Sequence, residues 1–196
     1  MAMWDRIKDQ AKTLQQQAQS GSSGSGGHGH SGSGGHGHAP AGAAGRGGSK
    51  SKAELVGLLK SQLTSLKTEL KSGAYRDASM AVCALVAAAD GHVDPAERQH
   101  VESLILSNDV LQNFPPEQLR SGFNKHVNAL SANVIRGRAE ALQEVAKAAK
   151  KPTEARAVVQ TGLVIAGADG YVSPAEEQIL REVCITLGLA PAEFGL

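Results

Sequence analysis

The chain has 196 residues, a formal net charge of +1, and a composition that is 41% hydrophobic but only 3% aromatic. No run approaches the roughly 18 uncharged apolar residues that a membrane-spanning helix needs. The start, MAMWDRIKDQ, is charged where a secretory signal would need an apolar core. We therefore expect a cytoplasmic protein, and the near-neutral charge gives no reason to expect nucleic acid as its partner.

Residues 1–19 show the pattern of a short amphipathic helix. Trp4, Ile7, Ala11, Leu14 and Ala18 recur at three- and four-residue steps, and charged residues and glutamines occupy the other face. We expect this segment to dock on a partner helix or to make a peripheral contact with a membrane surface. The alternative is a helix that docks loosely on its own body.

Residues 20–49 form a Gly/Ser/His-rich linker. They contain thirteen Gly, seven Ser and four His, with no aliphatic residue larger than alanine, so nothing there offsets the entropy of ordering. The linker is expected to be disordered. His28, His30, His36 and His38 form two His-x-His pairs that could bind zinc or nickel weakly, or the segment is a spacer with incidental histidines.

Residues 50–196 are expected to form a separate all-α domain, a compact bundle of about seven helices. Leucines at three- and four-residue steps predict the first helix, and proline, glycine or an acidic turn bounds each of the others. No segment alternates with the period of two that is typical of a strand. The predicted helices are 51–73, 75–89, 95–106, 116–130, 131–150, 152–168 and 174–187. Cys83 and Cys184 both fall in apolar helical patterns and are expected to be reduced core residues.

An internal repeat is the sharpest signal in the sequence. AAADGHVDPAERQ (residues 87–99) matches AGADGYVSPAEEQ (residues 166–178) at nine of thirteen positions, with an offset of 79 residues. Apolar helices precede and follow both copies, so the repeat unit is predicted to be helix, acidic turn, helix. The pattern predicts a body with an internal pseudo-duplication.

Local capping explains part of each copy. Asp94 and Ser173 each precede a proline and stand three residues before Glu97 and Glu176, which is the arrangement of a capping box. Gly91 and Gly170 are expected to end the preceding helices in the left-handed conformation. The two glutamates could therefore have no role beyond capping.

Capping does not explain Asp90 and Asp169, which are expected at helix C-termini, where the helix dipole disfavours a carboxylate. A bound cation would reverse that interaction. We therefore predict a divalent metal site, with oxygen ligands that favour calcium, magnesium or manganese. Either water completes the coordination of each turn, or both turns share one acidic patch. The predicted ligands are Asp90, Glu97, Asp169 and Glu176, with Asp94 and Glu177 as additional candidates.

At these residues the chain resembles the family of the tellurite-resistance protein TerB. The doubled Asp-Gly-x-Val-x-Pro-Ala-Glu pattern and the ending LREVCITLGLAPAEFGL carry the resemblance, which covers roughly residues 71–196. It implies an all-helical bacterial domain linked to tellurite resistance, other chemical stress and phage defence. It also implies that the four repeated acids bind divalent metal, and that the protein works with a membrane-bound partner, TerC, and other Ter proteins at the inner face of the cytoplasmic membrane.

Two classes of function remain from the sequence. One is a metal-binding or metal-sensing module, and the other is a scaffold whose acidic face docks a basic partner without metal. The chain shows no nucleophile with a nearby base, no phosphate-binding glycine loop and no nucleotide motif, so we do not expect an enzyme.

Overall fold

A computed structural model describes residues 52–93 and 95–196. Within these residues the chain forms seven α-helices and three short 3-10 helices and no strand, which confirms the all-α prediction. The predicted N-terminal helix, the linker with its four histidines, and Asp94 lie outside the described residues. Within the described part, no helix combines the length and apolar character needed to cross a membrane.

The predicted helix boundaries are close to those observed. In chain order the elements are α2 (Lys52–Ser65), α3 (Gly73–Ala87), α4 (Pro95–Ser107), η1 (Leu111–Asn113), α5 (Pro116–Ala132), α6 (Val134–Ala146), η2 (Lys147–Lys150), α7 (Pro152–Ala166), α8 (Pro174–Thr186) and η3 (Pro191–Phe194). Four of the α-helices, α4, α5, α7 and α8, begin at the prolines where the sequence predicted a helix start. Proline fits the first helical position, because no intrahelical hydrogen bond is made there by the backbone N–H.

Two predicted helices are interrupted. The first, predicted over residues 51–73, ends at Ser65, and the Asn113 side chain then donates hydrogen bonds to the backbone oxygens of Lys67 (2.6 Å) and Leu70 (3.1 Å). The predicted helix over residues 131–150 is shorter, because Asn133 caps α6 by accepting from the Arg136 N–H at 2.9 Å. These tertiary and capping contacts override the apolar periodicity.

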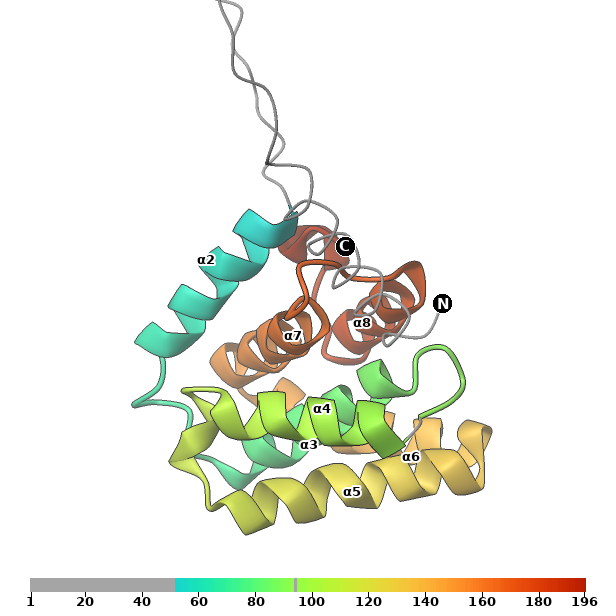
Figure 1. Cartoon of the computed structure of the whole chain (residues 1–196). Helices are drawn as coiled ribbons and strands as arrows, with labels where there is room; N and C mark the ends of the chain where they lie inside the picture. Colours follow the sequence, from blue (N-terminus) through green and yellow to red (C-terminus); the bar gives the residue numbers. More distant parts are fainter. Residues whose placement is uncertain (1–51, 94) are drawn as a thin grey trace, which may run out of the picture. The chain divides into compact units, whose positions relative to one another are not determined.

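Helices α3 and α7 form the centre of the body. They pack against each other, α5 and α6 cover α3, and α2 and α8 pack on α7 (Figure 1). From Ala78 to Ala87 every residue of α3 is buried, and α7 is buried from Ala157 to Ala166. Such nearly all-round burial is typical of a helix enclosed by others. Each acidic turn therefore directly follows one of the two central, buried helices.

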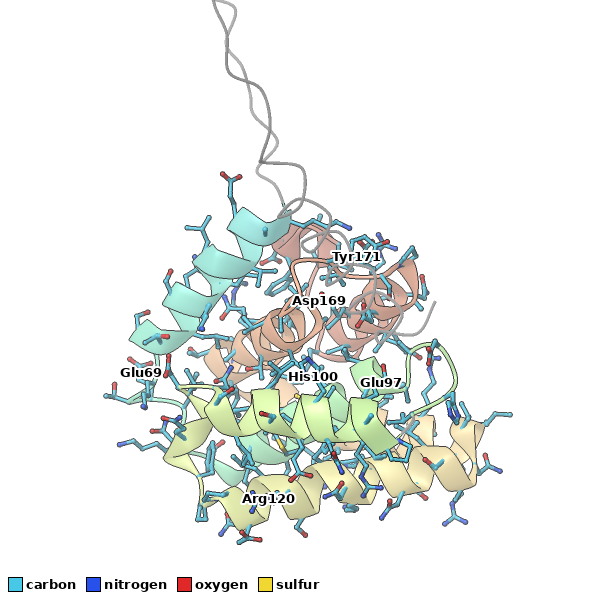
Figure 2. All side chains as sticks on the ribbon, viewed as in Figure 1. Glu69, Glu97, His100, Arg120, Asp169 and Tyr171 are labelled. Atoms are coloured by element: carbon cyan, nitrogen blue, oxygen red, sulfur yellow. The ribbon has the colours of Figure 1, made fainter. Side chains whose placement is uncertain are left out.

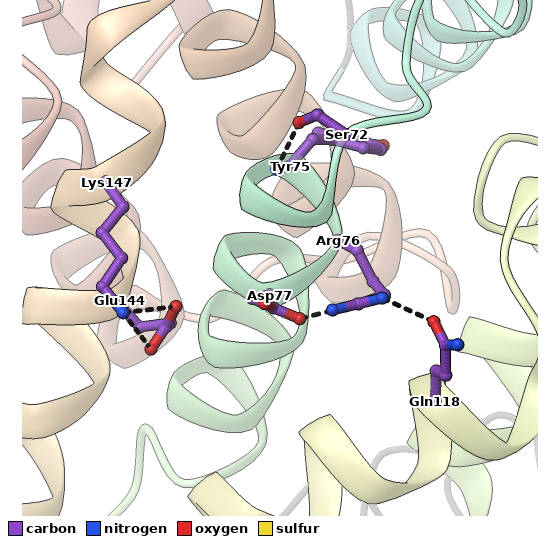
Figure 3. Close-up of polar contacts among 7 residues, drawn as sticks. All are labelled: Ser72, Tyr75, Arg76, Asp77, Gln118, Glu144 and Lys147. Atoms are coloured by element: carbon purple, nitrogen blue, oxygen red, sulfur yellow. Dashed lines mark hydrogen bonds and ion pairs between the residues drawn. The ribbon is translucent and has the colours of Figure 1, made fainter.

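Polar contacts join the first turn of α3 to α7. The Ser72 hydroxyl accepts from the Tyr75 N–H at 3.1 Å (Figure 3) and donates to the carboxylate of Glu154 at 2.8 Å. The hydroxyls of Tyr75 and Thr161 lie 2.9 Å apart, and burial raises the pKa of Tyr75 to about 12. Since buried polar groups are costly unless paired, these contacts fix the alignment of α3 and α7.

Further polar contacts lie at the surface near these central helices. Arg76 of α3 donates to the neighbouring Asp77 at 2.7 Å and to Gln118 of α5 (Figure 3). Lys147 donates to both oxygens of Glu144 at 3.0 Å where α6 passes into η2.

Candidate functional site: two acidic turns

The first acidic turn follows α3, which ends at Ala87. Gly91 has φ of +88°, in the region that glycine adopts without strain, as the sequence predicted. The exposed carboxylate of Asp90 accepts a hydrogen bond from the His92 N–H at 3.2 Å. This bond is an Asx turn, in which the side chain takes the place of a backbone acceptor.

The second acidic turn, after α7, has the same local geometry. Gly170 has φ of +84°, and the carboxylate of Asp169 accepts from the Tyr171 N–H at 3.1 Å. The predicted capping box is present: Glu176 accepts from the Ser173 N–H at 2.7 Å, and the Ser173 hydroxyl accepts from the Glu176 N–H at 3.2 Å. Figure 2 shows Asp169 and Tyr171 in this turn.

These contacts correct one step of the sequence argument. The helices were expected to continue to residues 89 and 168, which would have placed Asp90 and Asp169 against unpaired helix carbonyls. Instead α3 and α7 end at Ala87 and Ala166, and each aspartate lies in the turn beyond and accepts a backbone N–H. A cation is therefore not required to explain these carboxylates, since the turn itself stabilises an acceptor at this position.

The glutamates of the two turns are more buried than the aspartates. Glu97 in the first turn of α4 is 6% exposed, and Glu176 in the first turn of α8 is 4% exposed. Figure 2 shows Glu97 at the start of α4. Acids in the first turn of a helix are favoured by the helix dipole. A capping role for Glu176 is thus established, and Asp94, the predicted cap before Glu97, lies outside the described residues.

Glu177, an additional candidate ligand, is paired with cations of the chain. It forms an ion pair with Lys52 of α2 and accepts from Arg181 at 3.3 Å. The equivalent position in the first copy is Arg98, which donates to Asn124 of α5 at 2.6 Å. Sequence reasoning did not identify Lys52 or Asn124, because no local pattern shows which residue a distant helix brings to a turn.

The described residues do not gather all the predicted ligands around one point. Within 52–93 and 95–196, no three His, Cys, Asp or Glu side chains are arranged so that they could hold a metal ion. The two turns therefore do not form a single shared acidic cluster there. The other arrangement expected from the sequence, a site at each turn completed by water, stays a prediction.

A cavity lies beside the first turn. It has a volume of about 290 Å³, and Gly91, His92 and Val93 of the turn face Leu130 and Val134 across it. Val134 is 48% exposed and the next residue, Ile135, is 86% exposed. This cavity could not be predicted from the sequence, because it lies between the first turn and the junction of α5 and α6, which come together only in the folded chain.

Both cysteines are buried core residues, as the sequence predicted. Cys83 and Cys184 are both reduced and buried. Burial raises the pKa of Cys83 to about 12 and is the main cause that raises the pKa of Cys184 to about 11. Because the thiolate is the reactive form, neither residue has the environment of a reactive cysteine.

Comparison with known proteins identifies the family. Residues 76–196 match the family described as tellurite resistance protein TerB. No curated protein and no solved structure matches the chain. The matched region includes both acidic turns, all of the helices that follow α3, and the C-terminal segment with the buried Phe194. Because this match spans more than half of the 196 residues, the chain belongs to the tellurite resistance protein TerB family.

Proposed function

We propose that this protein is a non-enzymatic, cytoplasmic component of tellurite and stress resistance that binds divalent cations at its two acidic turns. The observation that carries the proposal is the family match, which spans both copies of the turn. Association with a membrane-bound TerC-like protein and other Ter proteins, at the inner face of the cell membrane, is the partner arrangement that the family suggests.

The donor set supports a hard cation. Each turn offers carboxylate oxygens from one aspartate and one glutamate, Asp90 with Glu97 and Asp169 with Glu176, and carboxylates favour calcium, magnesium or manganese. A bound ion would supply positive charge that neutralises these acids and steadies the turn. With few protein ligands, the affinity is expected to be weak, with Kd of about 10⁻⁴ to 10⁻³ M.

A metal-independent scaffold is the alternative. The Asx bonds of Asp90 and Asp169 and the capping box of Glu176 give three of the acids a structural role without any ion. In that case the acidic face would attract a basic partner electrostatically, and charge alone would matter.

Calorimetry with calcium separates the two functions. The starting protein is the full chain with His28, His30, His36 and His38 replaced by Asn, which removes imidazole binding in the linker. It is compared with the same chain carrying Asp90→Asn and Asp169→Asn. Asparagine keeps the oxygen that accepts the turn hydrogen bond but removes the charge. We expect heat of binding at millimolar calcium only with the aspartates present.

The thermal stability of the two proteins without metal is the control for this experiment. The double variant should unfold at nearly the same temperature as its parent without calcium, because the Asx turns persist. If the parent shows neither heat nor a thermal shift up to millimolar calcium, magnesium or manganese, the scaffold function replaces the metal-binding proposal.

Membrane association is tested separately at the N-terminal segment. We propose that residues 1–19 make the peripheral membrane contact or dock on the membrane-bound partner, with Trp4 as the main apolar anchor. The full chain should float with phospholipid liposomes, and Trp4→Ala should reduce the floated fraction. Equal flotation of the two proteins would contradict a role for this segment.

A further inference from the structure

The two acidic turns differ in what covers their valines. Val172 of the second turn is 3% exposed, and it lines a small cavity together with Leu55 and Val56 of α2. A Cβ atom on Gly167, at the base of this turn, would lie 2.7 Å from Val56, so α2 approaches the turn closely. Val93, the equivalent residue of the first turn, is only partly buried. The start of α2 therefore covers the second turn, whereas the first turn stays partly open in the described structure.

The open side of the first turn is the cavity of about 290 Å³, and Ala88 and Val93 line one of its walls. Their equivalents in the second copy are Gly167 and Val172, the residues that α2 covers. An apolar cavity of about 150 Å³ is enough for a benzene-sized group, so this one has room for an aliphatic side chain. The internal repeat thus indicates what kind of group the first cavity would accept.

The most exposed large apolar side chain of the described residues stands beside this cavity. Ile135 is 86% exposed, and it directly follows Val134, which lines the opposite wall and is 48% exposed. Both lie in the first turn of α6, so this exposed aliphatic group also belongs to the start of a helix, as Leu55 and Val56 of α2 do. One surface therefore carries both an exposed aliphatic side chain and a cavity that can hold one.

The charges beside these two features are opposite in sign. At the cavity, the exposed Asp90 carboxylate accepts the His92 N–H but takes part in no ion pair within the described residues. Next to Ile135, the Arg136 side chain is 81% exposed, and its partner is Glu140 of the same helix at 2.8 Å. The net charge of the chain is only +1, so two copies do not repel each other strongly. The surface is therefore complementary to itself in charge as well as in shape.

We propose that this surface is a two-fold interface between two copies of the chain, in which Ile135 of each copy enters the cavity beside the first acidic turn of the other. A two-fold axis makes the same contact twice, so it suits a surface that carries both an exposed side chain and a cavity for it. Arg136 of each copy then lies near Asp90 of the other. This interface gives the first turn the cover that α2 gives the second, and it does not depend on metal binding.

Sedimentation equilibrium of the full chain tests the interface. Because the contact is small, we expect a weak dimer with a Kd of about 10–100 µM. Ile135→Glu should weaken dimerisation at least about tenfold, since a carboxylate would have to enter a largely apolar cavity. A glutamate in the first turn of a helix is favourable, so α6 should be retained. The matched control is Leu58→Glu on α2, a helix that packs on α7, and it should dimerise as wild type.

A second variant tests the cavity separately from the isoleucine. Ser131 is exposed and lines the cavity, so Ser131→Trp should fill it and weaken dimerisation about tenfold while Ile135 is intact. Asp90→Asn and Arg136→Gln should each weaken the dimer about two- to fivefold. Because the two charges pair with each other across the interface, both changes together should cost no more than either alone. Thermal unfolding of each variant should match wild type.

The outcomes separate this interface from other forms of self-association. Loss of the dimer in both Ile135→Glu and Ser131→Trp, but not in Leu58→Glu, is the result we expect. A chain that stays monomeric up to about 1 mM would overturn the proposal. A dimer that persists in Ile135→Glu or in Ser131→Trp would overturn it as well, because the contact would then lie elsewhere. Additive effects of Asp90→Asn and Arg136→Gln would contradict the pairing of these two charges.

Discussion

The two acidic turns share a backbone but have different neighbours. Both have a glycine with positive φ, an aspartate that accepts the N–H two residues later, and a proline that begins the next helix. The first turn lies beside an open cavity, and Arg98 ties it to α5. The second lies under α2, and Lys52 ties Glu177 to that helix. Repetition in the sequence therefore sets the local geometry, while distant helices set the charge around each copy.

The largest predicted effects are in the helices that follow the two turns, and they test how similar the two copies of the repeat are. Leu180 of α8 and Val101 of α4 are equivalent in the repeat and both are fully buried. Leu180→Ala should lower the free energy of unfolding by about 3 kcal/mol and Val101→Ala by about 2 kcal/mol, since each leaves a cavity in the core. Urea denaturation measures both. A loss below about 0.5 kcal/mol at either site would show that this copy does not anchor its helix in the core.

A smaller effect tests the turn backbone. Gly91→Ala and Gly170→Ala should each cost about 1 kcal/mol, because alanine is strained in the left-handed region. An added Cβ would meet nothing within 4 Å at either position, so the cost comes from the backbone alone. Denaturation should therefore give nearly equal losses for the two variants. Clearly unequal losses would contradict the shared turn geometry.

The smallest effect tests the difference between the turns. Glu177→Gln removes the ion pair with Lys52, and Arg98→Gln weakens the contact with Asn124, each at a cost of about 0.5 kcal/mol. The stability change should fall with added salt for Glu177→Gln, whose partner is charged, and much less for Arg98→Gln, whose partner is a neutral amide. The same salt response for both would remove the contrast between the two neighbourhoods.

Sequence predicted the features that depend on near neighbours in the chain. The left-handed glycines, the capping box of Ser173 and Glu176, and the helix starts at proline are confirmed, because each depends on a few adjacent residues. The burial of both cysteines is also confirmed. These are the features that capping chemistry and apolar periodicity describe directly.

Features that depend on distant parts of the chain could not be predicted. Asn113 contacts the backbone beyond the end of α2, and the Lys52 to Glu177 pair spans 125 residues of sequence. The Asx bonds of Asp90 and Asp169 are local, and turn chemistry could have indicated them. They were missed because the preceding helices were expected to extend two residues further, to Ala89 and Ala168.

The most direct test of metal binding at the acidic turns is a crystal of the full chain grown with manganese, with an anomalous difference map. Our account predicts one peak at each turn, one beside Asp90 and Glu97 and one beside Asp169 and Glu176, each completed by water. A map in which both turns are well ordered but neither has an anomalous peak would contradict it. The duplicated acids would then serve capping and docking alone.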